Sequence, residues 1–339
     1  MRKLFASLAG LSLVIACAMP TLAQSYTFAT VDHPNQTFTQ LLGINNSGVI
    51  AGYFGDGTVV PNNGFTLTLP NTFTPENFPG AAQTQVIGIN ASGNTDGFYI
   101  DANGVTNGFT DVNGNGGAGG TGGTFTTVDA PGTAFNQLLG LNNIGVLAGY
   151  SSTDPTGATL QMAFIDKSGS FTYLNPFLPS GVGNTQATGI NNGGDISGFY
   201  MTNSGADSSG FLLTPLGGGY SLTSLNFPGS TFTQALGLNN DGNIVGSYVD
   251  AAGNTHGFIY NANTGKYQTI DDPSGVGTTT ANGINELNQI VGFYGPGGTI
   301  DHGFVATPTP EPASLLLLGT GLLGLGLLMK RKAAPFRSC

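Results

Sequence analysis

The sequence has 339 residues, of which 56 are Gly and only 8% are charged. All 18 acidic residues lie within residues 24–312, where Lys167 and Lys266 are the only basic side chains, so this part carries a formal charge of −16. Such a surface repels nucleic acid, whose binding requires a basic footprint. Cys17 and Cys339 lie in the terminal segments, which excludes disulfides and thiolate chemistry from the central region.

The first 23 residues have the order of a secretory signal peptide. Arg2 and Lys3 are followed by an apolar run over 4–16 that is too short to span a bilayer, and small residues lead up to Ala23. We therefore expect signal peptidase to cut after Ala23. The alternative is a lipoprotein signal, in which Cys17 becomes a lipidated N-terminus.

The central region, 24–309, repeats one motif six times. Each copy reads Gly, then Ile or Leu, then Asn, with a second Gly nine residues after the first. The first glycines are Gly43, Gly88, Gly140, Gly189, Gly237 and Gly283. Each copy holds four short β-strand patterns separated by Asn- and Gly-rich turns. Four strands in about 45–50 residues are typical of a propeller blade.

The phase of the strands predicts how the array closes. A strand pattern over 26–31 precedes the first motif, and the last copy lacks the corresponding fourth strand. Supplying this strand from the N-terminus would close a ring and remove its exposed edges. We therefore expect an all-β fold, a six-bladed β-propeller of four-stranded repeats closed by the N-terminal strand. The alternative is an open β-solenoid or a two-sheet array, which leaves that strand unexplained.

The last 30 residues, 310–339, combine a Pro-Glu-Pro triplet, an uncharged apolar stretch and a basic cluster. In order, these are Pro310, Glu311 and Pro312, then 313–329, then Lys330, Arg331 and Lys332. Seventeen uncharged residues are the lower limit for a transmembrane helix, and the basic cluster favours a cytoplasmic C-terminus. The pattern predicts a transmembrane helix over 313–329 that initially holds the exported protein in the inner membrane.

This tail resembles the PEP-CTERM sorting signal. The resemblance implies a Gram-negative bacterium that makes extracellular polysaccharide, and cleavage near Pro-Glu-Pro by an exosortase-like enzyme. The protein would then reside in the cell envelope, on the outer surface or in the extracellular matrix. The alternative is a plain membrane anchor that is retained.

A second resemblance lies in the third strand pattern of each copy. His256-Gly257-Phe258 and His302-Gly303-Phe304 resemble the His-Ala-Phe (HAF) repeat of bacterial extracellular proteins, which implies an exported repeat domain and no particular activity. Because Asn, Met or Ser stands in place of His256 and His302 in other copies, we expect packing roles for these two side chains. We expect His33 to be exposed.

No catalytic constellation is present. The sequence contains no Gly-x-Ser-x-Gly, His-Glu-x-x-His or phosphate-binding loop, so we predict no catalytic residue and no cofactor site. Asp32, Asp129 and Asp271 share a repeat position, where we expect them to terminate strands. Two of them facing each other in a propeller mouth would instead suit a glycan-cleaving enzyme.

We predict no metal site, and the alternative is a calcium site in one loop. Asp111, Asn113 and Asn115 match the first half of a calcium loop, but Gly122 stands where the loop requires a bidentate Glu.

The sequence therefore favours a non-enzymatic exported protein that binds extracellular polysaccharide or has a structural role in a biofilm. The alternatives are a secreted glycan-active enzyme and a permanently membrane-anchored binding module.

The processing of both ends is testable by intact-mass measurement on protein from the outer-surface fraction. We expect a chain that begins at Gln24 and ends near Glu311. A mass that still includes 313–339 would contradict processing of the tail and favour a retained anchor.

Overall fold

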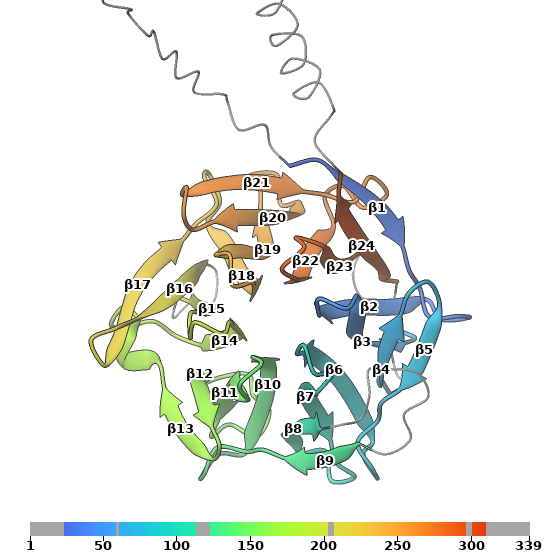
Figure 1. The fold of residues 1–339 in the computed structure, drawn as a ribbon. Helices are drawn as coiled ribbons and strands as arrows, with labels where there is room; N and C mark the ends of the chain where they lie inside the picture. Colours follow the sequence, from blue (N-terminus) through green and yellow to red (C-terminus); the bar gives the residue numbers. More distant parts are fainter. Residues whose placement is uncertain (1–23, 59–60, 113–122, 203–206, 296–299, 310–339) are drawn as a thin grey trace, which may run out of the picture.

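The predicted strands form a closed ring. The computed structural model describes residues 24–58, 61–112, 123–202, 207–295 and 300–309. This part of the chain contains 24 β-strands and one short 3-10 helix, η1 (Asn175–Phe177). The strands radiate from a central axis in antiparallel units, an all-β propeller arrangement (Figure 1).

Each unit contributes four strands, ordered from the axis to the perimeter. The first three units are β2 (Phe38–Ile44), β3 (Val49–Gly55), β4 (Asn63–Thr68) and β5 (Thr72–Pro75); β6 (Gln83–Ile89), β7 (Thr95–Ile100), β8 (Thr106–Val112) and β9 (Thr124–Thr127); and β10 (Phe135–Leu141), β11 (Val146–Ser152), β12 (Met162–Lys167) and β13 (Ser170–Tyr173). The next two are β14 (Thr185–Ile190), β15 (Ile196–Met201), β16 (Ser208–Leu216) and β17 (Gly219–Leu225); and β18 (Phe232–Leu238), β19 (Asn243–Val249), β20 (Thr255–Asn261) and β21 (Lys266–Ile270). The sixth is β22 (Thr279–Ile284), β23 (Ile290–Tyr294), β24 (His302–Pro308) and β1 (Tyr26–Thr30).

The N-terminal strand closes the ring as the sequence predicted. β1 pairs antiparallel with β24 in a continuous register from Tyr26–Pro308 to Thr30–Phe304. Residues from opposite ends of the repeat array therefore share one four-stranded sheet. This pairing covers the edge of β24 that would otherwise remain open.

The expectation of six separate blades is wrong in one respect. Four units form sheets of their own, whereas the units β14–β17 and β18–β21 share one eight-stranded sheet. They are joined by a single parallel bridge between Ser208 and Phe232, both of which lie inside strands. Similar bridges elsewhere, between Thr255 and Thr278 for example, involve a residue outside the strands and leave the sheets separate.

Each unit buries one phenylalanine completely, and in four of the units a glycine makes room for the ring. The six side chains are Phe65, Phe109, Phe164, Phe211, Phe258 and Phe304. A Cβ added to Gly198 would lie 2.4 Å from Phe211 Cζ and 2.2 Å from the Gln186 carbonyl oxygen. The second glycine of the motif is therefore required by packing. Each buried ring contributes about 1.5–3 kcal/mol from the removal of its surface from water.

The first glycine of the motif lets neighbouring inner strands approach each other. A Cβ on Gly43 would lie 2.6 Å from the Ile87 carbonyl oxygen of the next unit. Each inner strand also shifts register just before this glycine, as between Leu41 and Gly43 in β2. Such a bulge bends the strand locally, at the point where the six strands converge.

The asparagine that follows in the motif forms a closed ring of hydrogen bonds around the axis. Each Nδ2 donates to the backbone carbonyl of the equivalent asparagine in the next unit, at 3.0–3.3 Å, and the sixth returns to the first. The members are Asn45, Asn90, Asn142, Asn191, Asn239 and Asn285, all buried. Their Oδ1 atoms accept backbone N–H groups of the following turn, as Asn239 does from Asp241 and Asn243.

The next residue in each turn forms a second, incomplete ring. The backbone N–H of Asn143 donates to Asn192 Oδ1 at 2.9 Å, and the same contact recurs between other neighbouring units, with Glu286 accepting in one of them. Ala91 stands in this position in the second unit and has no side-chain oxygen to offer Asn46. The second ring therefore lacks one contact.

Within the described ranges, no helix is long and apolar enough to cross a membrane. The helix predicted over 313–329 and the signal peptide over 1–23 lie outside the described residues and stay predictions.

The asparagine rings are testable by thermal and denaturant unfolding. Asn239→Ala removes the hydrogen bond to the Asn285 carbonyl and the oxygen that accepts from the N–H groups of Asp241 and Asn243. These backbone groups would lose their partners, so we expect a loss of about 2–3 kcal/mol in unfolding free energy. Ala91→Asn supplies the missing acceptor, and we expect a gain of about 0.5–1 kcal/mol. Asn103→Ala, in an exposed turn away from the axis, is the control and should change stability little. Equal losses from Asn239→Ala and Asn103→Ala would contradict the account.

Candidate functional site

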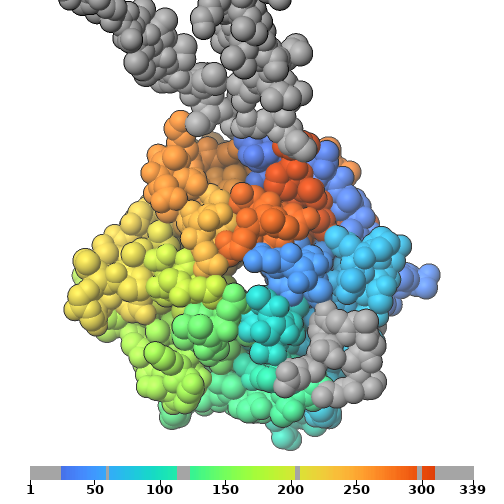
Figure 2. Space-filling view, in the orientation of Figure 1, coloured from blue at the N-terminus to red at the C-terminus, as the bar shows by residue number. Residues whose placement is uncertain are grey.

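A channel runs along the axis of the ring and forms a cavity lined by the inner strands. Its volume is about 570 Å³, within the range of small-molecule sites. An opening is visible at the centre of the ring in Figure 2. Because side chains alternate along a strand, every second residue of each inner strand points into this space while its neighbours enter the core. Leu42 thus lines the channel and Leu41 is fully buried.

Equivalent positions of the six inner strands form tiers along the channel. One tier consists of five glutamines and a threonine: Gln40, Gln85, Gln137, Gln186, Gln234 and Thr280. The next tier, nearer the asparagine ring, is mainly aliphatic: Leu42, Ile87, Leu139, Thr188, Leu236 and Asn282. The asparagine ring surrounds the narrow end, where the adjoining cavity measures about 90 Å³.

An aromatic collar stands behind the glutamine tier. Each glutamine or Thr280 pairs across strands with a residue of the second strand, and in five units that residue is aromatic. These five are Tyr53, Phe98, Tyr150, Phe199 and Phe293. In the remaining unit Gln234 pairs with Ser247. The collar is therefore interrupted at one place.

Some glutamines are held in place and others are not. Tyr53 Oη donates to Gln40 Oε1 at 2.5 Å, and Gln40 Nε2 donates to Asp301 Oδ2 at 2.7 Å. Tyr150 Oη similarly donates to Gln137 Oε1 at 2.8 Å. Within the described part of the chain, the side-chain amide of Gln234 has no hydrogen-bond partner. Its donors and acceptor are available to a bound molecule.

The channel is electrically neutral. None of its described lining residues is Asp, Glu, Lys, Arg or His. Asp301 approaches it only through Gln40; burial raises the pKa of this carboxyl, and the hydrogen bond from Gln40 opposes that rise. Burial and the nearby Asp301 also raise the pKa of the Tyr53 hydroxyl. The tyrosine therefore stays protonated at neutral pH and donates its hydrogen bond.

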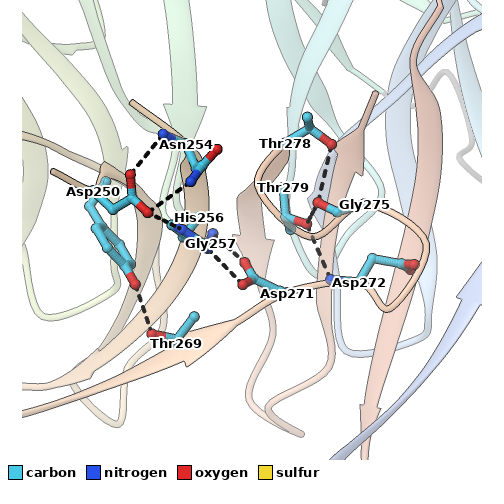
Figure 3. Close-up of polar contacts among 11 residues, drawn as sticks. Asp250, Asn254, His256, Gly257, Thr269, Asp271, Asp272, Gly275, Thr278 and Thr279 are labelled. Atoms are coloured by element: carbon cyan, nitrogen blue, oxygen red, sulfur yellow. Dashed lines mark hydrogen bonds and ion pairs between the residues drawn. The ribbon is translucent and has the colours of Figure 1, made fainter. Parts of the chain in front are cut away.

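The two repeat histidines are not part of this lining. Each binds the aspartate that follows the outer strand of its unit, and His256 also binds Asp250, which follows β19. His256 Nδ1 lies 2.7 Å from Asp271 Oδ2, and His256 Nε2 lies 3.3 Å from Asp250 Oδ2, as Figure 3 shows. His302 Nδ1 lies 2.8 Å from Asp32 Oδ2. Burial opposes the charge on His256, but its two aspartate partners outweigh burial and raise its pKa.

The aspartates predicted to terminate strands bind backbone groups of their own units. Asp32, Asp129 and Asp271 accept the N–H of Gly303, Gly108 and Gly257 at 3.2, 3.0 and 3.3 Å. None of the three lines the channel. The structure does not bring them together as a pair at the mouth.

The expectation that His33 is exposed is wrong. Its ring is half-buried and stacks on Phe54 with centroids 3.6 Å apart, and it also meets Phe73 edge-on. Burial lowers its pKa. The aromatic side chains of β3 and β5 provide this environment, which the Asp-His sequence at the end of the first strand did not reveal.

The calcium candidates are only partly described. Asn113 and Asn115 lie outside the described residues, while Asp111 is buried at the end of β8 and its Oδ1 has no hydrogen-bond partner there. No group of three or more His, Cys, Asp or Glu suited to a metal occurs in the described ranges. Calcium at this loop therefore stays untested.

The second unit places a carboxylic acid at a core position where four of its siblings have Ala or Val and one has Ser. Asp96 occupies the position of Val245 and Val291, and it is fully buried. Its Oδ1 accepts the Gly88 N–H at 2.8 Å, while Oδ2 has no partner within the described residues. Burial raises its pKa to about 7, against the hydrogen bond from Gly88.

Glu76 lies in a similar environment between the first two units. Its carboxyl accepts a hydrogen bond from Thr95 Oγ1. Burial raises its pKa to about 7; the Thr95 hydrogen bond opposes this rise, and nearby Asp111 adds to it.

Sequence reasoning missed the glutamine tier, although a signal was present. Five of the six motifs have Gln three residues before the first glycine, as Gln40 precedes Gly43, and the sixth has Thr280. The spacing shows that these positions are equivalent. It does not show which face of the strand points to the axis, and it is this orientation that places the glutamines in the channel lining.

One segment of the chain matches the model of a known family. Residues 308–332 match the PEP-CTERM protein-sorting motif. The match includes the predicted residues Pro310 to Pro312 and the basic cluster 330–332. The chain therefore carries a PEP-CTERM sorting motif, which implies an exported protein. No curated protein sequence matches the chain.

Solved structures of similar shape are distant in sequence. TolB from Acinetobacter baumannii has a TM-score of 0.49 at 12% identity, over 76% of this chain and 64% of that chain, so the chain spans less than two thirds of TolB. The fucose-binding lectin of Aleuria aurantia has a TM-score of 0.44 at 12% identity, over 85% and 97% of the two chains. A mutant of AofleA from Arthrobotrys oligospora has a TM-score of 0.46 at 13% identity, over 82% and 90%. At these values the likeness supports no conclusion about function.

The buried acid of the second unit is testable through the pH dependence of unfolding. Because the folded pKa of Asp96 lies above its ordinary value of 3.8, the folded state holds its proton while the unfolded chain loses it. Stability should therefore fall as the pH rises from about 4 to about 7.

We expect Asp96→Val to raise the unfolding free energy at pH 7 by about 1–3 kcal/mol. Stability of the variant should also depend less on pH, because each unit of pKa difference between the folded and unfolded states corresponds to about 1.4 kcal/mol. Urea unfolding at several pH values measures both effects. An unchanged slope in the variant would show that Asp96 is not the titrating group.

Proposed function

We propose that this protein is an exported, non-enzymatic binding module of the cell surface or extracellular matrix, and that it binds extracellular polysaccharide through its axial channel. The sorting motif over 308–332 supports export. We further propose that exosortase-like processing removes the tail, and that the HAF-like third strands mark a six-bladed ring in which two blades share a sheet.

One observation supports the binding role above the others: the channel presents amide and hydroxyl groups but no charged side chain among its described lining residues. Six amide side chains and several hydroxyl groups face a cavity of about 570 Å³. Amides and hydroxyls recognise neutral ligands by hydrogen bonds, and they are too weakly acidic or basic to transfer protons at neutral pH. A channel with this lining suits binding better than catalysis.

The enzyme alternative requires paired carboxyl groups that face a bound sugar, about 5–10 Å apart. Among the described residues, Asp32, Asp129 and Asp271 are each bonded to a glycine amide and lie outside the channel lining. The pairing on which this alternative was based is therefore not favoured. A permanently anchored binding module would use the same channel and differ only in the fate of the tail.

The channel's role is testable with a pair of Leu→Trp variants of the exported protein. Leu139 lines the aliphatic tier, so Leu139→Trp should narrow the channel. Leu216 is 67% exposed in the β16–β17 hairpin, so Leu216→Trp adds the same side chain to the outer surface. We expect cosedimentation with the matrix polysaccharide of the same culture to fall at least fivefold for Leu139→Trp and to stay unchanged for Leu216→Trp.

Thermal unfolding of both variants checks that they fold. Equal binding by both variants would contradict the channel as the binding site. Loss of binding by Leu216→Trp alone would assign binding to the outer surface.

A further inference from the structure

The interruption of the aromatic collar at Ser247 gives the channel one unequal side. In the other five units the residue paired with the inner glutamine or threonine is aromatic, and here it is serine. The channel lining accordingly extends outward in this unit, where it includes Phe232, Val249 and Thr255. No equivalent of Val249 or Thr255 lines the channel in the other units.

The missing ring uncovers a phenylalanine. Phe38 and Phe135 hold the same place at the start of β2 and β10, where Tyr53 and Tyr150 lie against them with ring centroids 6.0 and 5.8 Å apart. Neither Phe38 nor Phe135 lines the channel. Phe232 has no such tyrosine in its unit, and it does line the channel. A flat apolar surface is thereby exposed to whatever the channel holds.

Three polar groups surround this surface without partners of their own. Within the described residues, the amide of Gln234 and the side-chain hydroxyls of Ser247 and Thr255 form no hydrogen bonds. Each group can both donate and accept. In the next tier, Asn282 Nδ2 is also buried without a partner.

The exposed aromatic ring and the unpaired polar groups together indicate which chemical class of ligand fits the site. A neutral sugar ring has hydroxyls that donate and accept, and an apolar face of C–H groups that packs on an aromatic ring. A uronic acid or sulfated sugar would bring a negative charge into a channel with no described basic residue and a central region of charge −16. Desolvating an unpaired charge is costly. The site therefore favours neutral over anionic glycans.

We propose that the channel binds one residue of a neutral glycan at the Ser247 gap, with the sugar face on Phe232 and its hydroxyls on Gln234, Ser247 and Thr255. This inference rests on the proposed function, because it takes the channel to be the binding site. It adds the ligand class and makes Ser247 the residue that determines specificity.

The test uses the exported protein and oligosaccharides released from the matrix of its own culture, separated into neutral and anionic fractions, with cellohexaose and a galacturonate hexamer as defined probes. Binding is measured by calorimetry and native mass spectrometry. Ser247→Phe copies the aromatic residue of other units and should fold, as thermal unfolding would verify. We expect it to weaken binding of the neutral fraction at least tenfold. Ser247→Ala keeps the gap open but removes one hydrogen-bonding hydroxyl, so it should weaken binding by a smaller factor, about threefold.

The possible results separate failure of the proposed ligand class from failure of the channel as the binding site. Unchanged neutral binding by Ser247→Phe, preferred binding of the anionic fraction, or no binding of any neutral glycan would overturn the inference. If matrix binding still depends on Leu139 in any of these cases, the channel remains the binding site and only the ligand class fails. If matrix binding is also insensitive to Leu139→Trp, the proposed function fails with it.

Discussion

The closed ring of asparagine hydrogen bonds determines how near the six units come to the axis. Each Nδ2 reaches a carbonyl of the next unit at 3.0–3.3 Å, which is possible only where the inner strands almost touch. The first glycine of each motif follows from this, because a Cβ on Gly237 would lie 2.4 Å from the Asn282 carbonyl oxygen. The same approach narrows one end of the channel. Toward the other end, larger side chains line a space wide enough for a ligand.

Packing within each unit depends on a second glycine, and this links the repeat motif to the core. Gly246 and Phe258 illustrate the arrangement, since a Cβ on the glycine would lie 2.8 Å from the ring. The phenylalanine is fully buried in every unit. The motif thus records two separate constraints, one at the axis and one in the middle of each sheet.

Much of this fold was predictable from the sequence, since the repeat spacing, the strand patterns and the unpaired N-terminal strand all follow from turn residues and alternation. Three features were not. The sequence pattern predicts only that the asparagines form turns. Their contact with the next unit depends on the curvature of the whole ring, which no local pattern specifies. The shared sheet depends on Ser208 lying inside a strand, which no local pattern specifies. The Gln234–Ser247 pair is visible in the sequence, but its meaning depends on which face lines the channel.

Two acidic residues, one in the second unit and one between the first two units, show that the architecture tolerates carboxyl groups in its core at a cost. Asp96 and Glu76 occupy buried positions, and burial raises the pKa of each to about 7. They remain largely protonated below neutral pH, which reduces the cost of burying them. The channel, by contrast, has no titratable carboxyl among its described lining residues. The buried carboxyl groups and the uncharged channel lining therefore lie in different parts of the described structure.

The most direct test of this account is hydrogen–deuterium exchange of the exported protein with and without the polysaccharide of its own matrix. Binding in the channel predicts slower exchange in the inner strands β2, β6, β10, β14, β18 and β22, strongest in β18 and its partner β19. Protection confined to the outer strands β1, β5, β9, β13, β17 and β21 would contradict the account and place binding on the perimeter of the ring.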